Sequence, residues 1–145
     1  MRFLMIPTPA PGSPAPAAEP TFDENLFTAY MKYNEDMHVA GVLVASEGLQ
    51  PGLAGAHVTI RGGERTVTDG PFAESKELVA GFWLIDVKSK AEAIEWALRS
   101  PINPAYDEVI EIRHLTGAAD IPAELVKLCI AAAPKWSESW QKSGD

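Results

Sequence analysis

The ten residues LVAGFWLIDV, positions 78–87, constrain the fold more than any other stretch of this chain. Alternate residues of a strand point to opposite sides, so Phe82 and Leu84 would lie on one face and Trp83 and Ile85 on the other. Large apolar side chains on both faces are typical of a strand in the middle of a covered sheet. The chain is therefore expected to build a sheet with a layer on each side.

Other strands are predicted on both sides of this run. Residues 2–6, 42–49 and 108–115 have strand character, and residues 57–68 predict a hairpin. The hairpin turns at Gly62-Gly63, a pair that accepts positive φ at both positions. Within 42–49, simple alternation places Leu43, Ala45 and Glu47 on one face. Within 108–115 it places Val109, Glu111 and Arg113 on one side and Ile110, Ile112 and His114 on the other.

Helices are predicted from caps and apolar spacing. Thr21 with Glu24, and Ser89 with Glu92, have the spacing of a capping box. Asp120 is the predicted cap of a third helix over 121–133, ended by Pro134. The apolar stripes that follow are Leu26, Phe27, Tyr30, Tyr33 and Met37, ending at Gly41, and then Ala91, Ile94 and Leu98, ending at Pro101. Six prolines in 7–20 exclude a helix or a central strand there and predict an extended loop, with a flap over a pocket as the alternative.

The predicted order is strand, helix, strand, hairpin, strand, helix, strand, helix. Without the hairpin this is βαββαβ, a ferredoxin-like α+β fold in which helices cover one face of an antiparallel sheet. The second apolar face of 78–87 then needs another cover. A second copy of the same sheet, related by a two-fold axis, is the simplest one. We therefore expect one domain that forms a homodimer with a cavity between the sheets.

Composition excludes several classes of function. The 145 residues carry a net charge of −8 with scattered basic residues, which argues against direct binding to nucleic acid or an anionic membrane surface. No apolar run reaches the length of a membrane span, and the start of the chain lacks the apolar core of a secretory signal. Cys129 is the only cysteine and predicts neither a disulfide nor a cysteine-based zinc site. We expect a cytoplasmic protein without a cofactor.

The stretch TVTDGPF, residues 66–72, joins the hairpin to the central strand through an unusual corner. Gly70 gives backbone freedom, Pro71 fixes φ, and Phe72 can anchor the corner in the core. Asp69 can accept hydrogen bonds from backbone amides of such a turn. A purely structural role explains the corner, and a catalytic role for Asp69 is the alternative.

These residues resemble the YCII-related family, also known by its DGPF motif. The resemblance runs through YNEDMHVAGVLVASEGLQP, RTVTDGPFAESKELVAGFWLIDVKS, EAIEWALRSP and EIR, and covers about residues 1–115. It implies a dimeric α+β barrel, bacterial proteins whose biochemistry is mostly unassigned, and an association of some relatives with extracytoplasmic-function sigma factors. The 7–20 loop and a C-terminal part at 116–145, with Trp136 and Trp140 on one predicted helical face, lie outside it.

Two carboxylates at strand ends next to glycine, Asp69 and Glu47, form the candidate acid/base pair. Arg113 would hold an anionic substrate or keep one carboxylate ionised. The alternative is a capping aspartate with a cross-strand Glu–Arg ion pair. Candidate ligand-binding residues are Tyr33, Gly70, Pro71, Phe72, Lys76, Glu77 and Trp83, although Lys76 and Glu77 also suit a solvated corner or an ion pair between subunits.

The resembling family's shorter branch carries a His–Asp pair proposed as an acid/base couple. Asp69 keeps the acidic member, but none of His38, His57 and His114 matches the histidine, and their separation argues against a metal site. Two functions follow. The first is a small-molecule enzyme or binder with its cleft in the dimeric barrel. The second is a non-catalytic interaction or regulatory module, linked to sigma-factor-dependent transcription, that uses its dimer surface and the Trp136/Trp140 tail.

Overall fold

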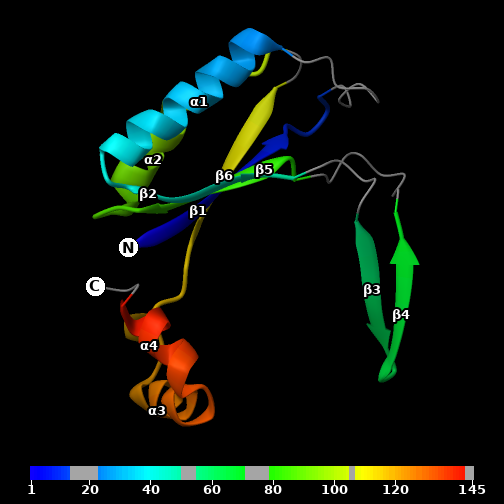
Figure 1. The fold of residues 1–145 in the computed structure, drawn as a ribbon, viewed down its shortest axis with the longest axis vertical. Helices are drawn as coiled ribbons and strands as arrows, with labels where there is room; N and C mark the ends of the chain where they lie inside the picture. The colour runs from blue at the N-terminus through cyan, green and yellow to red at the C-terminus, as the bar shows by residue number, and fades with distance from the viewer. Residues whose placement is uncertain (14–22, 50–54, 71–78, 105–106, 143–145) are drawn as a thin grey trace.

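A computed structural model describes residues 1–13, 23–49, 55–70, 79–104 and 107–142 (Figure 1). It is an α+β fold whose four-stranded antiparallel sheet has the order β2-β5-β1-β6, with a separate two-stranded sheet of β3 and β4. This is the predicted ferredoxin-like arrangement with an inserted hairpin. The elements are β1 (Arg2–Pro9), α1 (Glu24–Val39), β2 (Leu43–Gly48), β3 (Ala56–Arg61), β4 (Glu64–Asp69), β5 (Gly81–Asp86), α2 (Lys90–Leu98), β6 (Glu108–His114), a short 3-10 turn (Ala118–Asp120), α3 (Ala123–Ala132) and α4 (Pro134–Lys142).

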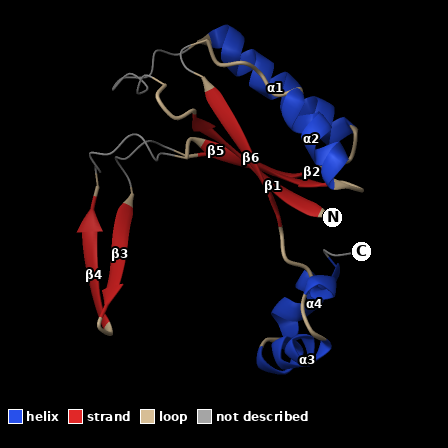
Figure 2. Ribbon diagram, turned by 180° about the vertical axis from the view of Figure 1, so that it is seen from behind, coloured by secondary structure: helices blue, strands red, loops and turns tan. Residues whose placement is uncertain are grey.

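The run that is apolar on both faces forms β5, and its predicted central position is confirmed. It pairs with β1 on one side and β2 on the other. Trp83 and Ile85 are buried, whereas Phe82 and Leu84 on the opposite face are only half-buried. This asymmetry arises because α1 and α2 both lie over the Trp83 face, as Figure 2 shows from behind. No described helix packs closely on the opposite face.

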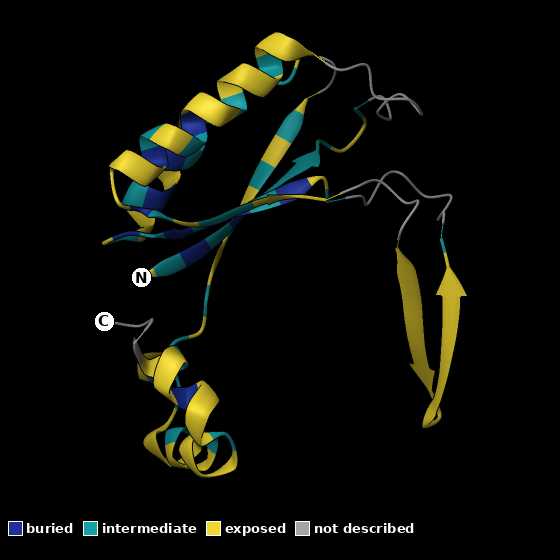
Figure 3. Cartoon of the chain, in the orientation of Figure 1, coloured by how far each residue is buried: buried dark blue, intermediate teal, exposed yellow. Residues whose placement is uncertain are grey.

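The core lies between the sheet and these two helices. It joins Phe3 and Met5 of β1 to side chains of α1 and α2. Its members are Phe3, Met5, Tyr33, Met37, Val42, Trp83, Ile85, Val87, Ala93 and Trp96. Figure 3 shows most of the buried residues in this layer, and a further buried position in α4, where Ser137 is buried.

The strand β1 is longer than predicted and includes two prolines that were assigned to a loop. Beyond Met5, β1 pairs only with β6, through Pro7 opposite Ile110 and Pro9 opposite Glu108. The even-numbered residues of β1 turn their backbone groups towards β6: Ala10 N donates to Asp107 O, and Arg2 O accepts from Leu115 N. Pro7 and Pro9 therefore face the unpaired side, where a missing N–H costs no ladder hydrogen bond.

The start of α1 corrects one predicted cap. Thr21 lies outside the described residues, and the N-cap is Asp23, whose carboxylate accepts hydrogen bonds from the amides of Asn25 and Leu26. At the other end, Gly41 adopts the positive φ expected of a residue that ends a helix.

The cap of α2 is confirmed in part and its predicted stripe is wrong. Ser89 Oγ accepts from the Glu92 amide, but the Glu92 carboxylate accepts from Lys88 N instead of closing the box on Ser89. The helix buries Ala93 and Trp96. The predicted stripe of Ala91, Ile94 and Leu98 is exposed, because the helix is turned so that its large Trp96 fills the core beside Tyr33.

Alternation along β2 is interrupted by a bulge. The register shifts between Leu43, opposite Ile85, and Ala45, opposite Leu84. Leu43 therefore lies on the helix side, whereas Ala45 and Glu47 share the sides of Leu84 and Phe82. The prediction that Leu43, Ala45 and Glu47 share one face is wrong, since an extra residue reverses the alternation.

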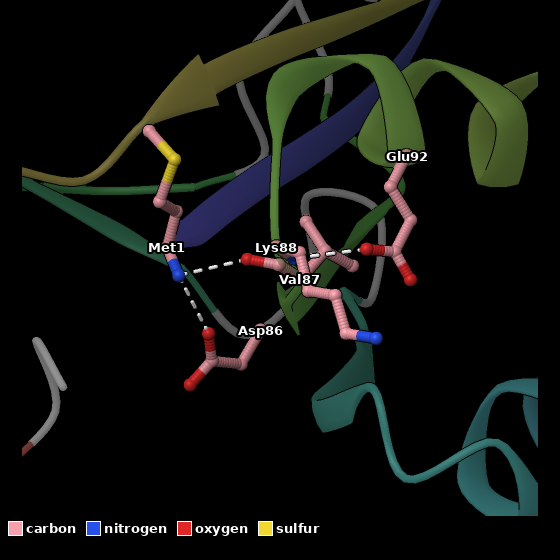
Figure 4. Close-up of polar contacts among 5 residues, drawn as sticks. All are labelled: Met1, Asp86, Val87, Lys88 and Glu92. Carbon is pink, nitrogen blue, oxygen red and sulfur yellow. Dashed lines mark hydrogen bonds and ion pairs between the residues drawn. The ribbon is translucent and has the colours of Figure 1, made fainter.

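The first residue is tied to the end of β5 (Figure 4). The Met1 amino group donates to Asp86 Oδ1 at 3.0 Å and to Val87 O at 2.8 Å. The ion pair is exposed and contributes little to stability. The contact links the start of β1 to the end of β5.

The C-terminal residues form a helical pair below the sheet (Figure 1). One predicted cap is wrong, because Asp120 accepts from Gly117 N in the 3-10 turn instead of capping α3. The predicted stop is confirmed, because α3 ends at Ala132 and Pro134 is already the first residue of α4. Pro134 fits this position because proline suits the first turn of a helix. Trp136 and Trp140 share one face of α4 as predicted, with ring centroids 5.4 Å apart. None of the helices in the described part of the chain has the length and apolar character needed to cross a membrane.

Candidate functional site

A cavity of about 350 Å³ opens at one end of the four-stranded sheet. At this end β1 and β2 finish, β5 and β6 begin, and the N-terminal half of α1 passes over them. The volume suits a small-molecule ligand. Its lining comes from α1 (Phe27, Tyr30, Met31, Asn34), β2 (Ser46, Glu47, Gly48), β5 and the residue before it (Ala80, Gly81, Phe82, Trp83), and Pro7, Asn103 and Glu108.

Aromatic rings form much of the wall. Tyr30 stacks on Trp83 with ring centroids 5.9 Å apart, and Phe27 and Phe82 add apolar surface. The Trp83 ring is itself fixed by an edge contact with Tyr33 at 5.4 Å. The wall is thus a packed aromatic surface suited to a flat or apolar molecule.

One polar side chain in the wall has a fixed orientation. Asn34 Oδ1 accepts hydrogen bonds from Trp83 Nε1 at 2.8 Å and Ser46 Oγ at 3.2 Å. The indole nitrogen can only donate, so the amide oxygen must face it and the Asn34 amino group must point the other way. This arrangement positions a hydrogen-bond donor at the cavity without rotational freedom.

Glycine allows the two strands to meet closely at the cavity. Gly81 lies opposite Gly48, and a Cβ on Gly81 would be 2.6 Å from the carbonyl oxygen of Glu47. Only a residue without a side chain fits there. The close approach sets the position of Glu47 at the end of β2.

The predicted catalytic residues do not meet within one chain. Glu47 lines the cavity, but Arg113 is on β6 at the opposite edge of the sheet. Strands lie about 4.8 Å apart, which separates the two edges by roughly 14 Å. Arg113 instead bonds Glu111 at 2.7 Å, and this hydrogen bond raises the pKa of the exposed guanidinium above its usual value. Asp69 ends β4, in the separate hairpin, opposite Ala56.

The predicted ligand-binding residues also fall in different places. Trp83 is in the cavity wall. Tyr33 is buried, and its hydroxyl donates to Trp96 O at 2.7 Å. Burial raises the pKa of Tyr33 to about 12, and the nearby Arg99 opposes this shift. Gly70 N donates to Gly55 O at the base of the hairpin, and Pro71, Phe72, Lys76 and Glu77 lie outside the described residues.

The histidines and the cysteine occupy separate elements. His38 is in the last turn of α1, His57 on β3 and His114 on β6, where its ring contacts Phe3. Cys129 lies half-buried in α3. Within the described ranges, no group of three or more histidine, cysteine or acidic residues is placed to hold a metal ion.

Sequence reasoning missed Tyr30, Asn34 and Gly81. Tyr30 was assigned to the core stripe of α1, and Asn34 follows it by one helical turn, so a polar residue within an apolar stripe was the available signal. The glycine before Phe82 was a second signal, since glycine inside a strand often marks a close backbone approach.

Two comparisons place this chain among known proteins. A family model, the YCII-related domain, matches residues 1–116. An uncharacterized protein of Rhizobium meliloti (strain 1021) is 47% identical over 77 residues, which are 52% of this chain and 61% of that relative. The matched stretch therefore covers less than two thirds of the relative's length. With a domain match over most of its length and the ferredoxin-like order of its strands and helices, the chain belongs to the YCII-related family.

Proposed function

We propose that this protein binds a small, largely apolar molecule with one hydrogen-bonding end in the cavity between α1 and the end of the sheet. The observation that carries the proposal is the stacked pair of Tyr30 and Trp83 beside the fixed amide of Asn34. The rings favour an apolar or flat body, and the amide favours a carbonyl or carboxylate oxygen at its end.

Glu47 is the candidate acid/base group of an enzyme built on this site. It lies at the cavity on the edge strand β2, and its side chain belongs with that of Phe82 to the helix-free side of the sheet. Asp69 and Arg113 are distant from it in one chain, so the three-residue site expected from the sequence requires a second copy to supply them. A homodimer whose second copy covers the half-buried Phe82 and Leu84 face is the partner we propose, and the cytoplasm is the proposed location.

Binding can be tested with a library of small aromatic carboxylic acids, amides and ketones, screened by ligand-observed NMR. We expect Tyr30→Leu to weaken the affinity of any hit at least tenfold, because the stacked ring is lost. Val39→Ala is the matched control on the same helix, since Val39 is 76% exposed and does not line the cavity. Equal affinities of the two variants would place the ligand elsewhere.

Catalysis needs a separate test. If a hit is turned over, Glu47→Gln should lower kcat at least 100-fold while the ligand still binds, because the amide cannot accept or release the proton. A Glu47→Gln variant with unchanged kcat would leave a binding protein without acid/base chemistry at this position.

A second candidate is an interaction module that uses the C-terminal helices. Leu125 is 48%, Leu128 63% and Trp136 55% exposed, which leaves a large apolar surface on α3 and α4. Such surfaces commonly mark protein contacts. Co-purification with and without residues 117–145, including sigma factors among the partners sought, separates this function from the first. Recovery that is independent of these residues would remove the helices from the proposal.

A further inference from the structure

The cavity at the end of the sheet has an acidic lining. Of its described lining residues, Glu47 and Glu108 have charged side chains, and both are acidic. None of the described lining residues is a lysine, an arginine or a histidine. The whole chain has a net charge of −8, so its long-range potential has the same sign. An anionic ligand would enter the cavity against this charge, whereas a cation would be attracted.

Glu108 lies on the side of the sheet that the helices cover. It begins β6 directly opposite Pro9 of β1, and directly opposite residues share a face. Phe3 and Met5, which share the odd numbering of Pro9, are buried in the core beneath the helices. The start of β6 and the N-terminal end of α1 lie at the same end of the sheet (Figures 1 and 2). The Glu108 carboxylate therefore belongs to the same side as the Tyr30 and Trp83 rings.

The position of Glu108 strengthens its effect on a ligand. Its side chain is half-buried. A charge that is partly removed from water interacts more strongly with a nearby charge than an exposed one does, and salt screens it less. Glu47 adds negative charge from the helix-free side of the same sheet end.

The aromatic wall favours the same sign of ligand charge. The face of an aromatic ring carries a negative potential, and an ammonium group within about 6 Å of a ring centroid is attracted to it. Phe27, Tyr30, Phe82 and Trp83 all line the cavity. A metal ion fits less well, because it needs several oxygen ligands and the described ranges gather no group of three or more ligating side chains. Rings and acids together select an organic cation.

Asn34 determines which end of the ligand carries the charge. Its amide oxygen already accepts from Trp83 Nε1 and Ser46 Oγ, so its amino group is what it offers to a ligand. An amino group only donates, so it suits a carbonyl oxygen and cannot bind an ammonium. The acidic lining disfavours a carboxylate at this position. The cation is therefore directed away from Asn34 and towards Glu108.

We propose that the cavity selects an organic cation: an amine or quaternary ammonium compound with an aromatic or apolar body and a neutral carbonyl group. Its nitrogen lies at Glu108, its body on the aromatic wall and its carbonyl oxygen at Asn34. This inference rests on the ligand cavity proposed above and deepens it by assigning the charge of the ligand. It separates the carbonyl compounds from the carboxylates that the Asn34 amide alone would accept.

The test uses three compounds that share one aromatic ketone and differ in charge. They are the cationic para-(aminomethyl)acetophenone, the neutral para-ethylacetophenone and the anionic para-acetylbenzoate. Their dissociation constants are measured at neutral pH by NMR titration of the isotope-labelled protein. The amine should bind at least about tenfold more tightly than the ethyl compound, and the benzoate at least about tenfold more weakly.

Glu108→Gln removes the charge and keeps the shape of the side chain. The preference for the amine over the ethyl compound should fall at least about fivefold, while the affinity for the ethyl compound changes less than about twofold. The neutral compound thus shows that the cavity is still folded. Glu111→Gln is the matched control, since it makes the same change on the opposite face of the same strand. A preference that survives Glu108→Gln, or that falls equally in Glu111→Gln, overturns the proposal.

Tyr30→Leu separates binding in the cavity from adsorption to an acidic surface. It should weaken the amine and the ethyl compound alike, and an amine that binds this variant as tightly as the wild type overturns the proposal. If the ethyl compound or the benzoate binds the wild type as tightly as the amine, the charge selection is overturned while the cavity remains a ligand site. If none of the three binds at about 10 mM, the selection and the ligand site are overturned together.

Discussion

At the scale of single residues, Gly81 is the residue whose replacement would most disturb the cavity, because it lets the backbones of β2 and β5 approach closely there. A Cβ there would lie 2.6 Å from Glu47 O and 3.3 Å from Gly48 Cα, both backbone atoms that cannot rotate away. We expect Gly81→Ala to destabilise the protein by about 1–3 kcal/mol, because β2 must shift from β5. Urea unfolding measures it, with Gly48→Ala as the control, since nothing lies within 4 Å of a Cβ on Gly48. Similar losses for both variants would contradict the close approach.

Tyr33 makes a prediction about alkaline pH. Its hydroxyl donates to Trp96 O, and burial raises its pKa to about 12 from 10.0. A folded-state pKa above the unfolded value gives stability that is complete below pH 10 and is lost as the pH rises towards 12. We expect wild-type stability to fall across this window and Tyr33→Phe to fall less. Denaturant midpoints of both proteins at pH 8, 10 and 11 measure the difference. An equal decrease of the midpoint with pH in the two proteins would contradict a buried, protonated Tyr33 hydroxyl.

At the scale of elements, the order and the pairing could be predicted, but the exact faces and ends could not. The two-sided run at 78–87 and the Gly62-Gly63 turn fix β5 and the hairpin through local patterns that need no partner. The bulge of β2 between Leu43 and Ala45 depends on its neighbour strand, so alternation alone placed Leu43 wrongly. The rotation of α2 likewise follows from where Trp96 fits in the core, a tertiary effect that helix spacing does not contain.

The cap of α1 gives the prediction at this scale. Asp23 accepts from two amides of the first turn at 2.9 and 3.0 Å, and that turn leads into the half of α1 that covers the cavity. We expect Asp23→Ala to cost about 1 kcal/mol of unfolding free energy, and Asp23→Ser to cost much less because a hydroxyl can also cap. Urea denaturation followed by far-ultraviolet circular dichroism compares them. Equal losses from Ala and Ser would mean that the carboxylate acts through charge and not through the cap.

At the scale of the whole molecule, the site was only partly foreseeable because its residues meet through folding. Glu47 and Trp83 were singled out from the sequence and both line the cavity, whereas Asp69 and Arg113 lie on other surfaces of the chain. Strand ends next to glycine identify where a site can form. They do not identify which strand ends lie together, because that depends on the order of the strands in the sheet.

Removing the C-terminal helices would show whether the rest of the chain keeps its stability without them. Every residue of the buried core cluster lies between Phe3 and Trp96, and the hydrogen bond from Trp140 Nε1 to Thr116 O links α4 back towards the end of β6. We expect a chain that ends at Thr116 to keep its urea midpoint within error, with a smaller m-value because less surface is exposed on unfolding. If the midpoint falls, its dependence on protein concentration decides the cause. A fall that disappears at high concentration means that α3 and α4 stabilise the assembly of two copies, and a fall at all concentrations means that they support the fold of each one.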